Sequence, residues 1–222
     1  MSASTATLPM LIIDTASKNT WIGFINSDQT TTWESSEDEA SYALFNCLRD
    51  LQAQGIDWKN ARSIAFNQGP GSMLGIRTAI MAIRTWTNAK TLPEKTQLFT
   101  YNSLALASEL PEASTANLII SDARRKSWNA FFPQEETPRT KLLSNEELES
   151  QEGNILILEE FTQWTKTSAE LHPLSYNPSI AFEKPSAIKH LQPIEIPIPL
   201  ILRESEYQKW VPRFSTTGGA DQ

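Results

Sequence analysis

The sequence predicts an α/β protein of two halves, each with a mixed sheet. Up to about residue 110, apolar side chains recur first at the two-residue spacing of strands and then at the three- and four-residue spacing of helices. A glycine-rich loop, NQGPGSMLG (67–75), separates an apolar run from a long apolar segment. A second series of apolar runs begins near residue 116, and a chain of 222 residues is long enough for two cores.

Three strands are predicted at the start of the chain. MLIID (10–14) is a continuous apolar run, and TWIGFIN (20–26) places alternate residues on opposite faces. TTTWES (30–35) follows the turn-rich NSDQ. The short connections predict an antiparallel meander of these strands.

Two helices are predicted next, with a strand at 63–66 between them. Ser36 and Glu39 have the spacing of a capping box for the first helix, which Gly55 ends in the left-handed conformation. Ser72 is the expected N-cap of the second helix. That helix is apolar nearly all round, so it must be covered on more than one side.

The remaining segments predict a second α/β half. We expect a strand at 98–100, a helix at 103–110, a strand-turn-strand unit at 116–132, a strand at 154–158 and a last strand at 198–203. The prolines of the last segment place it at a sheet edge. The predicted divisions are an N-terminal subdomain (1–110), a C-terminal subdomain (111–214) and a disordered tail (215–222).

Composition argues against several classes of function. The net charge of −7 repels polyanions, so direct nucleic-acid binding is not expected. No segment approaches the roughly 18 consecutive apolar residues of a membrane helix. One cysteine and two histidines do not suggest a metal cluster, and no cofactor is predicted. Residues 1–7 lack the features of a signal peptide, so we expect a cytoplasmic protein that does not bind membranes.

Five segments together resemble one family. IIDTA, NQGPGSMLGIRTAI, SLALAS, SDARRKSWNAFF and PLILR occur in the order and at about the distances seen in the TsaB (YeaZ) family. That family is the bacterial partner in threonylcarbamoyl-adenosine modification of tRNA. The resemblance covers about residues 10–203 and implies the actin, sugar-kinase and Hsp70-like (ASKHA) fold.

The sequence departs from the family pattern at several positions. Met73 and Leu74 stand where the family usually has Phe and Thr, and Thr78 and Met81 where it has small residues. The family histidine near Glu39 is missing. These departures concern partner contacts more than the fold.

The resemblance implies a scaffold without catalytic activity. Its catalytic partner in the family, TsaD, carries the His-x-x-x-His metal site and the nucleotide loops, which this sequence lacks. The ATPase TsaE is a further partner, and tRNA is reached only through the complex. In the family, the first two helices form the contact with TsaD. The interface residues implied here are Tyr42, Phe45, Met73, Arg77, Met81 and Arg84.

Two interpretations of the glycine loop remain open. Asp14, Gly69, Gly71 and Ser72 have the positions of an anion or nucleotide site at a strand end and a helix N-terminus. However, Ala16 stands where an ATPase of this fold would have glycine, and the loop has no lysine. The glycines would otherwise serve a turn and close packing, and Asp14 would cap a turn.

Other functions also remain open. The chain could be a small-molecule ATP-dependent enzyme of the same fold, or a homodimer without a catalytic partner. Asp122, Arg124 and Arg125 predict a salt-bridged hairpin turn or a phosphate-facing patch. Cys47 is expected in the core, and both His172 and His190 on the surface.

Overall fold

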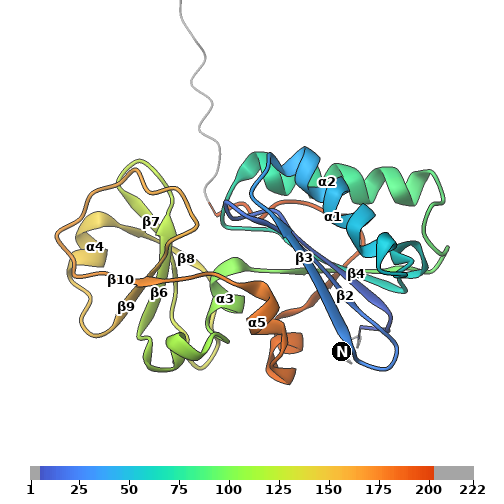
Figure 1. Cartoon of the computed structure of the whole chain (residues 1–222). Helices are drawn as coiled ribbons and strands as arrows, with labels where there is room; N and C mark the ends of the chain where they lie inside the picture. The colour runs from blue at the N-terminus through green and yellow to red at the C-terminus, as the bar shows by residue number, and fades with distance from the viewer. Residues whose placement is uncertain (1–5, 203–222) are drawn as a thin grey trace, which may run out of the picture.

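The computed structural model describes residues 6–202, which form two sheets lying side by side, each with its own helices. Figure 1 shows the half containing α1 and α2 next to the half containing β6 to β10, with α3 and α5 near their junction. Within the described part, no helix combines the length and hydrophobicity needed to cross a bilayer.

The first sheet has six strands in the order β11-β5-β4-β1-β2-β3. Strands β1 to β3 form the predicted antiparallel meander, with Ile12 opposite Gly23 and Gly23 opposite Trp33. Strands β4 and β5 continue the sheet in parallel from β1. The bounds are β1 Met10–Asp14, β2 Thr20–Ile25, β3 Thr31–Ser36, β4 Ser63–Asn67, β5 Gln97–Tyr101 and β11 Gln192–Ile194.

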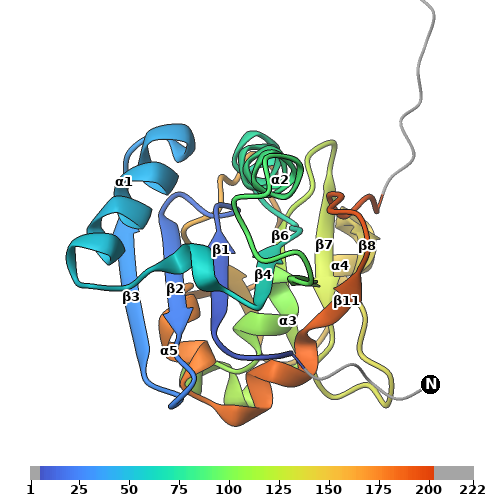
Figure 2. The ribbon, with the colours of Figure 1, turned by 90° about the vertical axis from the view of Figure 1, so that its right-hand side faces the viewer.

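Helices α1 (Ala40–Ala53) and α2 (Met73–Asn88) cover one face of this sheet, as Figure 2 shows. The other face carries α5 (Pro178–Phe182), which contacts β2. The apolar faces of α1 and α2 are buried against the sheet and each other, which gives the first half most of its core. The buried residues are Ala43, Leu44, Cys47, Leu48 and Leu51 on α1, and Gly75, Ile76, Ala79, Ile80, Ala82, Ile83 and Trp86 on α2.

The ends of these helices confirm two predictions and correct one. Ser72 caps α2 by accepting from the backbone N–H of Gly75, and Gly55 follows α1 with φ 86°. The capping box at Ser36 was wrong, because Ser36 ends β3 and is paired with Thr20. The N-cap of α1 is Glu39, without a side-chain hydrogen bond.

The second sheet has five strands in the order β10-β9-β6-β7-β8. The predicted strand-turn-strand unit is the antiparallel pair β6-β7, and the predicted 154–158 strand is β9, parallel to β6. Short helices connect these strands. The bounds are β6 Leu118–Asp122, β7 Ser127–Phe131, β8 Lys141–Ser144, β9 Ile155–Leu158, β10 His172–Leu174, α3 Ser103–Ala107, α4 Asn145–Glu149 and the 3-10 segments Trp58–Asn60, Pro111–Thr115 and Pro185–His190.

The chain returns to the first sheet near its end, but earlier than predicted. The edge strand is β11, antiparallel to β5, whereas residues 198–202 form no strand. Pro197 and Pro199 remove two backbone donors from this segment. Of its N–H groups, that of Leu200 donates to the carbonyl oxygen of Gln68 at 2.8 Å. Residue 203 and the predicted tail at 215–222 lie outside the described residues.

Candidate functional site

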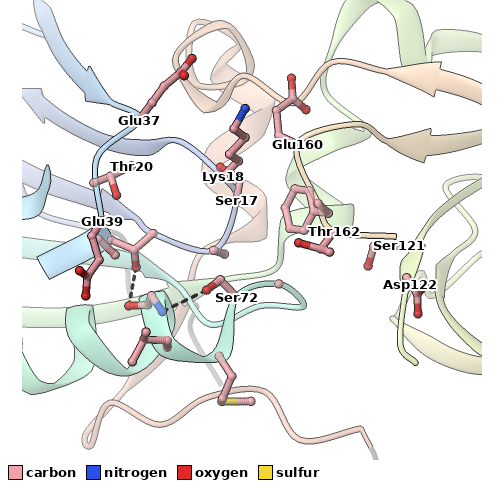
Figure 3. A pocket seen from close by; sticks show the side chains of 18 of the residues that line it. Ser17, Lys18, Thr20, Glu37, Glu39, Ser72, Ser121, Asp122, Glu160 and Thr162 are labelled. Atoms are coloured by element: carbon pink, nitrogen blue, oxygen red, sulfur yellow. Dashed lines mark hydrogen bonds between the residues drawn. The ribbon is translucent and has the colours of Figure 1, made fainter. Parts of the chain in front are cut away.

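A cleft of about 520 Å³ lies where the two halves meet. Figure 3 shows that its side chains come from both halves, with Lys18 and Ser72 on one side and Asp122 and Thr162 on the other. Its walls include the β1–β2 turn, the N-termini of α1 and α2, and the segment after β9. This position is where a ligand of an α/β protein would contact both halves.

The glycine loop packs directly against the β1–β2 turn. A Cβ atom on Gly71 would overlap the carbonyl oxygen of Ala16, and one on Gly75 would overlap that of Thr15. The backbone N–H of Ser72 donates to the Ala16 carbonyl oxygen at 2.6 Å. Gly69 has φ 109° and donates its N–H to Asn67 Oδ1 at 2.8 Å. These contacts give the glycines a structural role, and the N–H groups of Gly69 and Ser72 are already hydrogen-bonded within the protein.

Asp14 is fully buried, in a hydrogen-bonded network that joins the halves. Its Oδ2 accepts from Asn67 Nδ2 at 2.8 Å, from the Tyr101 hydroxyl at 2.9 Å and from the Tyr176 hydroxyl at 2.6 Å. Its Oδ1 accepts from the N–H of Ala16 at 3.1 Å, as expected of a turn-capping residue. Burial raises the pKa of Asp14, against the effect of these hydrogen bonds.

The charge of the cleft is unfavourable for a nucleotide. Two cations, Lys18 and Arg124, line it together with the carboxylates of Glu37, Asp38, Glu39, Asp122 and Glu160. Lys18 lies between Glu37 and Glu160 in Figure 3. A polyphosphate would therefore meet an excess of negative charge. Among residues 6–202, no three His, Cys, Asp or Glu side chains are grouped to hold a metal ion.

The predicted salt bridge in the β6–β7 turn was wrong. The hairpin turn is present, but Asp122 takes part in none of the ion pairs found within residues 6–202. Its carboxylate accepts instead from backbone N–H groups, that of Arg124 within the turn and those of Trp164 and Thr165. Arg124 lies over the Trp164 ring, 5.8 Å from its centre. Trp164 and Thr165 lie about forty residues away in sequence, so local spacing could not predict them as partners of Asp122.

Helices α1 and α2 carry exposed apolar side chains on the surface turned away from the first sheet. Tyr42 and Phe45 on α1 are 69% and 55% exposed, and Met73, Leu74 and Met81 on α2 are 44%, 67% and 58% exposed. We call these five residues the α1–α2 patch. Arg77 and Arg84, also predicted for the interface, are exposed beside it, and Arg84 donates to the carbonyl oxygen of Pro197 at 2.8 Å.

The structure confirms that Cys47 lies in the core and His172 on the surface, but the prediction of a surface position for His190 was wrong. Cys47 is buried, and burial raises its thiol pKa to about 11. His172 is exposed. His190 is only 13% exposed, because the segment Pro185–His190 folds back so that its ring contacts Glu109 at 2.8 Å. Local sequence gives no sign of a partner 81 residues away.

Comparison with known proteins identifies the fold. No protein-family model and no curated protein sequence matches the chain. Two solved structures from Pseudomonas aeruginosa, one described as YeaZ and one as an uncharacterised protein with similarity to peptidase YeaZ, align with a TM-score of 0.58. In each case, 18% of residues are identical, and the alignment covers 87% of this chain and 99% of the other.

The chain has the fold of YeaZ. The predicted α/β, ASKHA-type architecture and the resemblance to the TsaB (YeaZ) family are thus confirmed at the level of the fold. At this identity, the likeness to YeaZ establishes architecture only. The roles of the site residues therefore depend on their own geometry.

Proposed function

We propose that the chain is a non-catalytic scaffold subunit that binds and activates a TsaD-type catalytic subunit in threonylcarbamoyl-adenosine modification of tRNA. In this role, a TsaE-type ATPase joins through the complex, and tRNA is contacted only indirectly. The protein would act in the cytoplasm. The observation that carries the proposal is the α1–α2 patch.

The α1–α2 patch has the composition of a protein interface. Aromatic residues, methionine and arginine are enriched in interface cores; the patch holds the first two kinds, and the exposed Arg77 and Arg84 lie beside it. The opposite faces of both helices are already buried against the first sheet, so these residues have no role in the core. Contiguous exposed apolar side chains on a folded protein typically mark a surface that another molecule covers.

The geometry of the cleft supports the absence of catalysis. In an ATPase of this fold, an acid at the position of Asp14 would hold the metal-bound nucleotide. Here three side chains donate hydrogen bonds to the Asp14 carboxylate. The N–H of Ser72 is bonded to Ala16. A phosphate would have to displace these bonds in a cleft with excess negative charge.

Co-expression with the TsaD protein of the same genome tests the proposal. We expect the two chains to co-elute in size-exclusion chromatography, and the lone chain to show no ATPase or threonylcarbamoyl-transfer activity. Separate elution at micromolar concentration would contradict the proposal. Light scattering of the lone chain distinguishes the homodimer, in which the same patch would meet a second copy.

The size of the cleft, in contrast to its charge, is compatible with one alternative, an ATP-dependent enzyme acting on a small molecule. Its volume suits a nucleotide, and Lys18 reaches into it. Calorimetry separates the alternatives, since binding of ATP to the lone chain tighter than about 10 µM would favour the enzyme. Lys18→Gln is the matched variant, because it removes the cation while leaving the buried network intact.

A further inference from the structure

A second pocket, of about 420 Å³, lies between the N-terminus of α3, the loop before β8 and the segment Pro185–His190. It shares no lining residue with the cleft and none with the α1–α2 patch. Its volume lies within the range of small-molecule sites, roughly 300–1,000 Å³. None of the functions considered above uses it.

Two cationic side chains line this pocket on a protein whose net charge is −7. Arg139 and Lys189 come to it from separate segments. The Lys189 ammonium contacts Glu109 at 2.8 Å, whereas Arg139 takes part in none of the ion pairs found within residues 6–202. The pocket therefore has one guanidinium that is not neutralised by a carboxylate of the described chain.

Neutral hydrogen-bond donors lie beside this guanidinium. The Thr140 hydroxyl is buried in the pocket wall and has no hydrogen-bond partner within the described residues. Asn102 uses its Oδ1 to cap α3 through the N–H groups of Leu104 and Ala105, so its NH₂ group can donate elsewhere. This hydroxyl has almost no accessible surface, so it meets a ligand only when the Thr140 side chain turns toward the pocket. Because a buried hydroxyl without a partner is costly, a bound acceptor would favour that turn.

The pocket also has an apolar part, although Gln68, His190 and Gln192 line it as well. Phe131, Ala105 and the Tyr101 ring are buried behind it, and Leu200 closes one side. The Tyr101 hydroxyl points away, since it donates to Asp14. An apolar base with a few convergent polar groups is typical of a site that orients a small molecule.

The geometry points to a binding site for a small amphipathic anion, with one carboxylate or phosphate group on an apolar body. Arg139 pairs with the anionic oxygens, to which its planar guanidinium is suited, and the Thr140 hydroxyl donates to the same group once its side chain turns toward the pocket. The apolar body lies against Phe131 and Leu200. A polyanion such as nucleic acid is excluded by the small volume and by the negative charge of the whole chain.

Calorimetry of the full chain with phenylacetate, phenyl phosphate and benzyl alcohol tests this site, because the three ligands share an aromatic ring and differ in charge. We expect saturable binding of at least one anion and binding of the alcohol at least about tenfold weaker. The tighter of the two anions distinguishes carboxylate from phosphate. Failure of both to saturate by about 10 mM would overturn the proposal.

Two variants locate the binding. Arg139→Gln should weaken the anion about tenfold or more, while Arg62→Gln, on an exposed arginine outside the pocket, should change it less than about twofold. Thr140→Val removes a hydroxyl that has no partner, so it should keep or raise the melting temperature while weakening the anion. Full affinity in either pocket variant would refute the assignment.

Discussion

Met81→Asp is the sharpest test of the α1–α2 patch, because it places a charge at the middle of α2 without entering the core. Met81 is 58% exposed, so less than half of its side chain is buried. A charge at a core position would unfold the chain, but the exposure of Met81 places it outside the core. We expect the variant to fold and to lose its partner.

The expected cost to the lone chain is small. Losing the buried part of a methionine costs about 1 kcal/mol, and the lower helix propensity of aspartate adds about 0.5 kcal/mol. Arg77 lies four residues before position 81 and Arg84 three residues after it. Attraction of each to the new carboxylate would stabilise the folded variant by about 0.2–0.5 kcal/mol. The net loss is about 1 kcal/mol, or about 2–4 °C in melting temperature for a chain of this size.

The expected cost to the complex is larger. A carboxylate desolvated at an interface without a partner costs at least about 2 kcal/mol, or roughly thirtyfold in Kd. Size-exclusion chromatography with the partner, beside a circular-dichroism melt, measures both effects. Ile180→Asp is the control, since Ile180 is 40% exposed on α5, away from the patch. A Met81→Asp protein that unfolds, or that still co-elutes as the control does, would refute the placement of this surface.

Three further predictions concern stability. Glu109→Gln should cost about 1–2 kcal/mol at pH 7, a range that allows for solvent screening at the 63% exposed lysine partner, and almost nothing near pH 2. Burial raises the Glu109 pKa but hydrogen bonds outweigh it and lower the pKa from 4.5 to about 2, so the carboxylate stabilises the wild type above pH 4.5 and loses this effect as pH falls to about 2; urea titration across pH measures it, and a pH-independent difference would count against it. Tyr176→Phe should cost about 1–3 kcal/mol by removing a buried bond to Asp14, and calorimetric melting within 1 °C of wild type would contradict this. Gly75→Ala should destabilise the protein, although alanine normally favours helices by about 1 kcal/mol, because the new methyl group would overlap the Thr15 carbonyl oxygen; an unchanged or raised melting temperature would show that the turn can yield.

Much of the first half could be predicted from sequence because its strands and helices are amphipathic and locally connected. The meander, both long helices and the Ser72 cap follow from apolar spacing and turn residues within a few positions of one another. The exposed face of α2 was also predictable, because a helix that is apolar nearly all round cannot bury every side against one sheet.

The errors share a physical cause, which is that the decisive partners are distant in sequence. β11 is a strand because it meets the free edge of β5, although its own three residues include a proline. His190 is mostly withdrawn from solvent because its segment folds onto Glu109. Periodicity reports which faces are apolar, and it carries no information on which distant segment completes a hydrogen-bonded network.

Asp14 connects these observations to function. Its Oδ2 accepts from β4, from β5 and, through the Tyr176 hydroxyl, from the segment that follows β10 of the second sheet. A metal-bound nucleotide could use Asp14 only if that tyrosine moved away, which would break a 2.6 Å bond and leave a buried phenol without its acceptor. The same bond restrains the two halves relative to each other. An acid at the end of the first strand thus stabilises the junction in one arrangement, which favours presenting a fixed helical surface to a partner over opening and closing around a substrate.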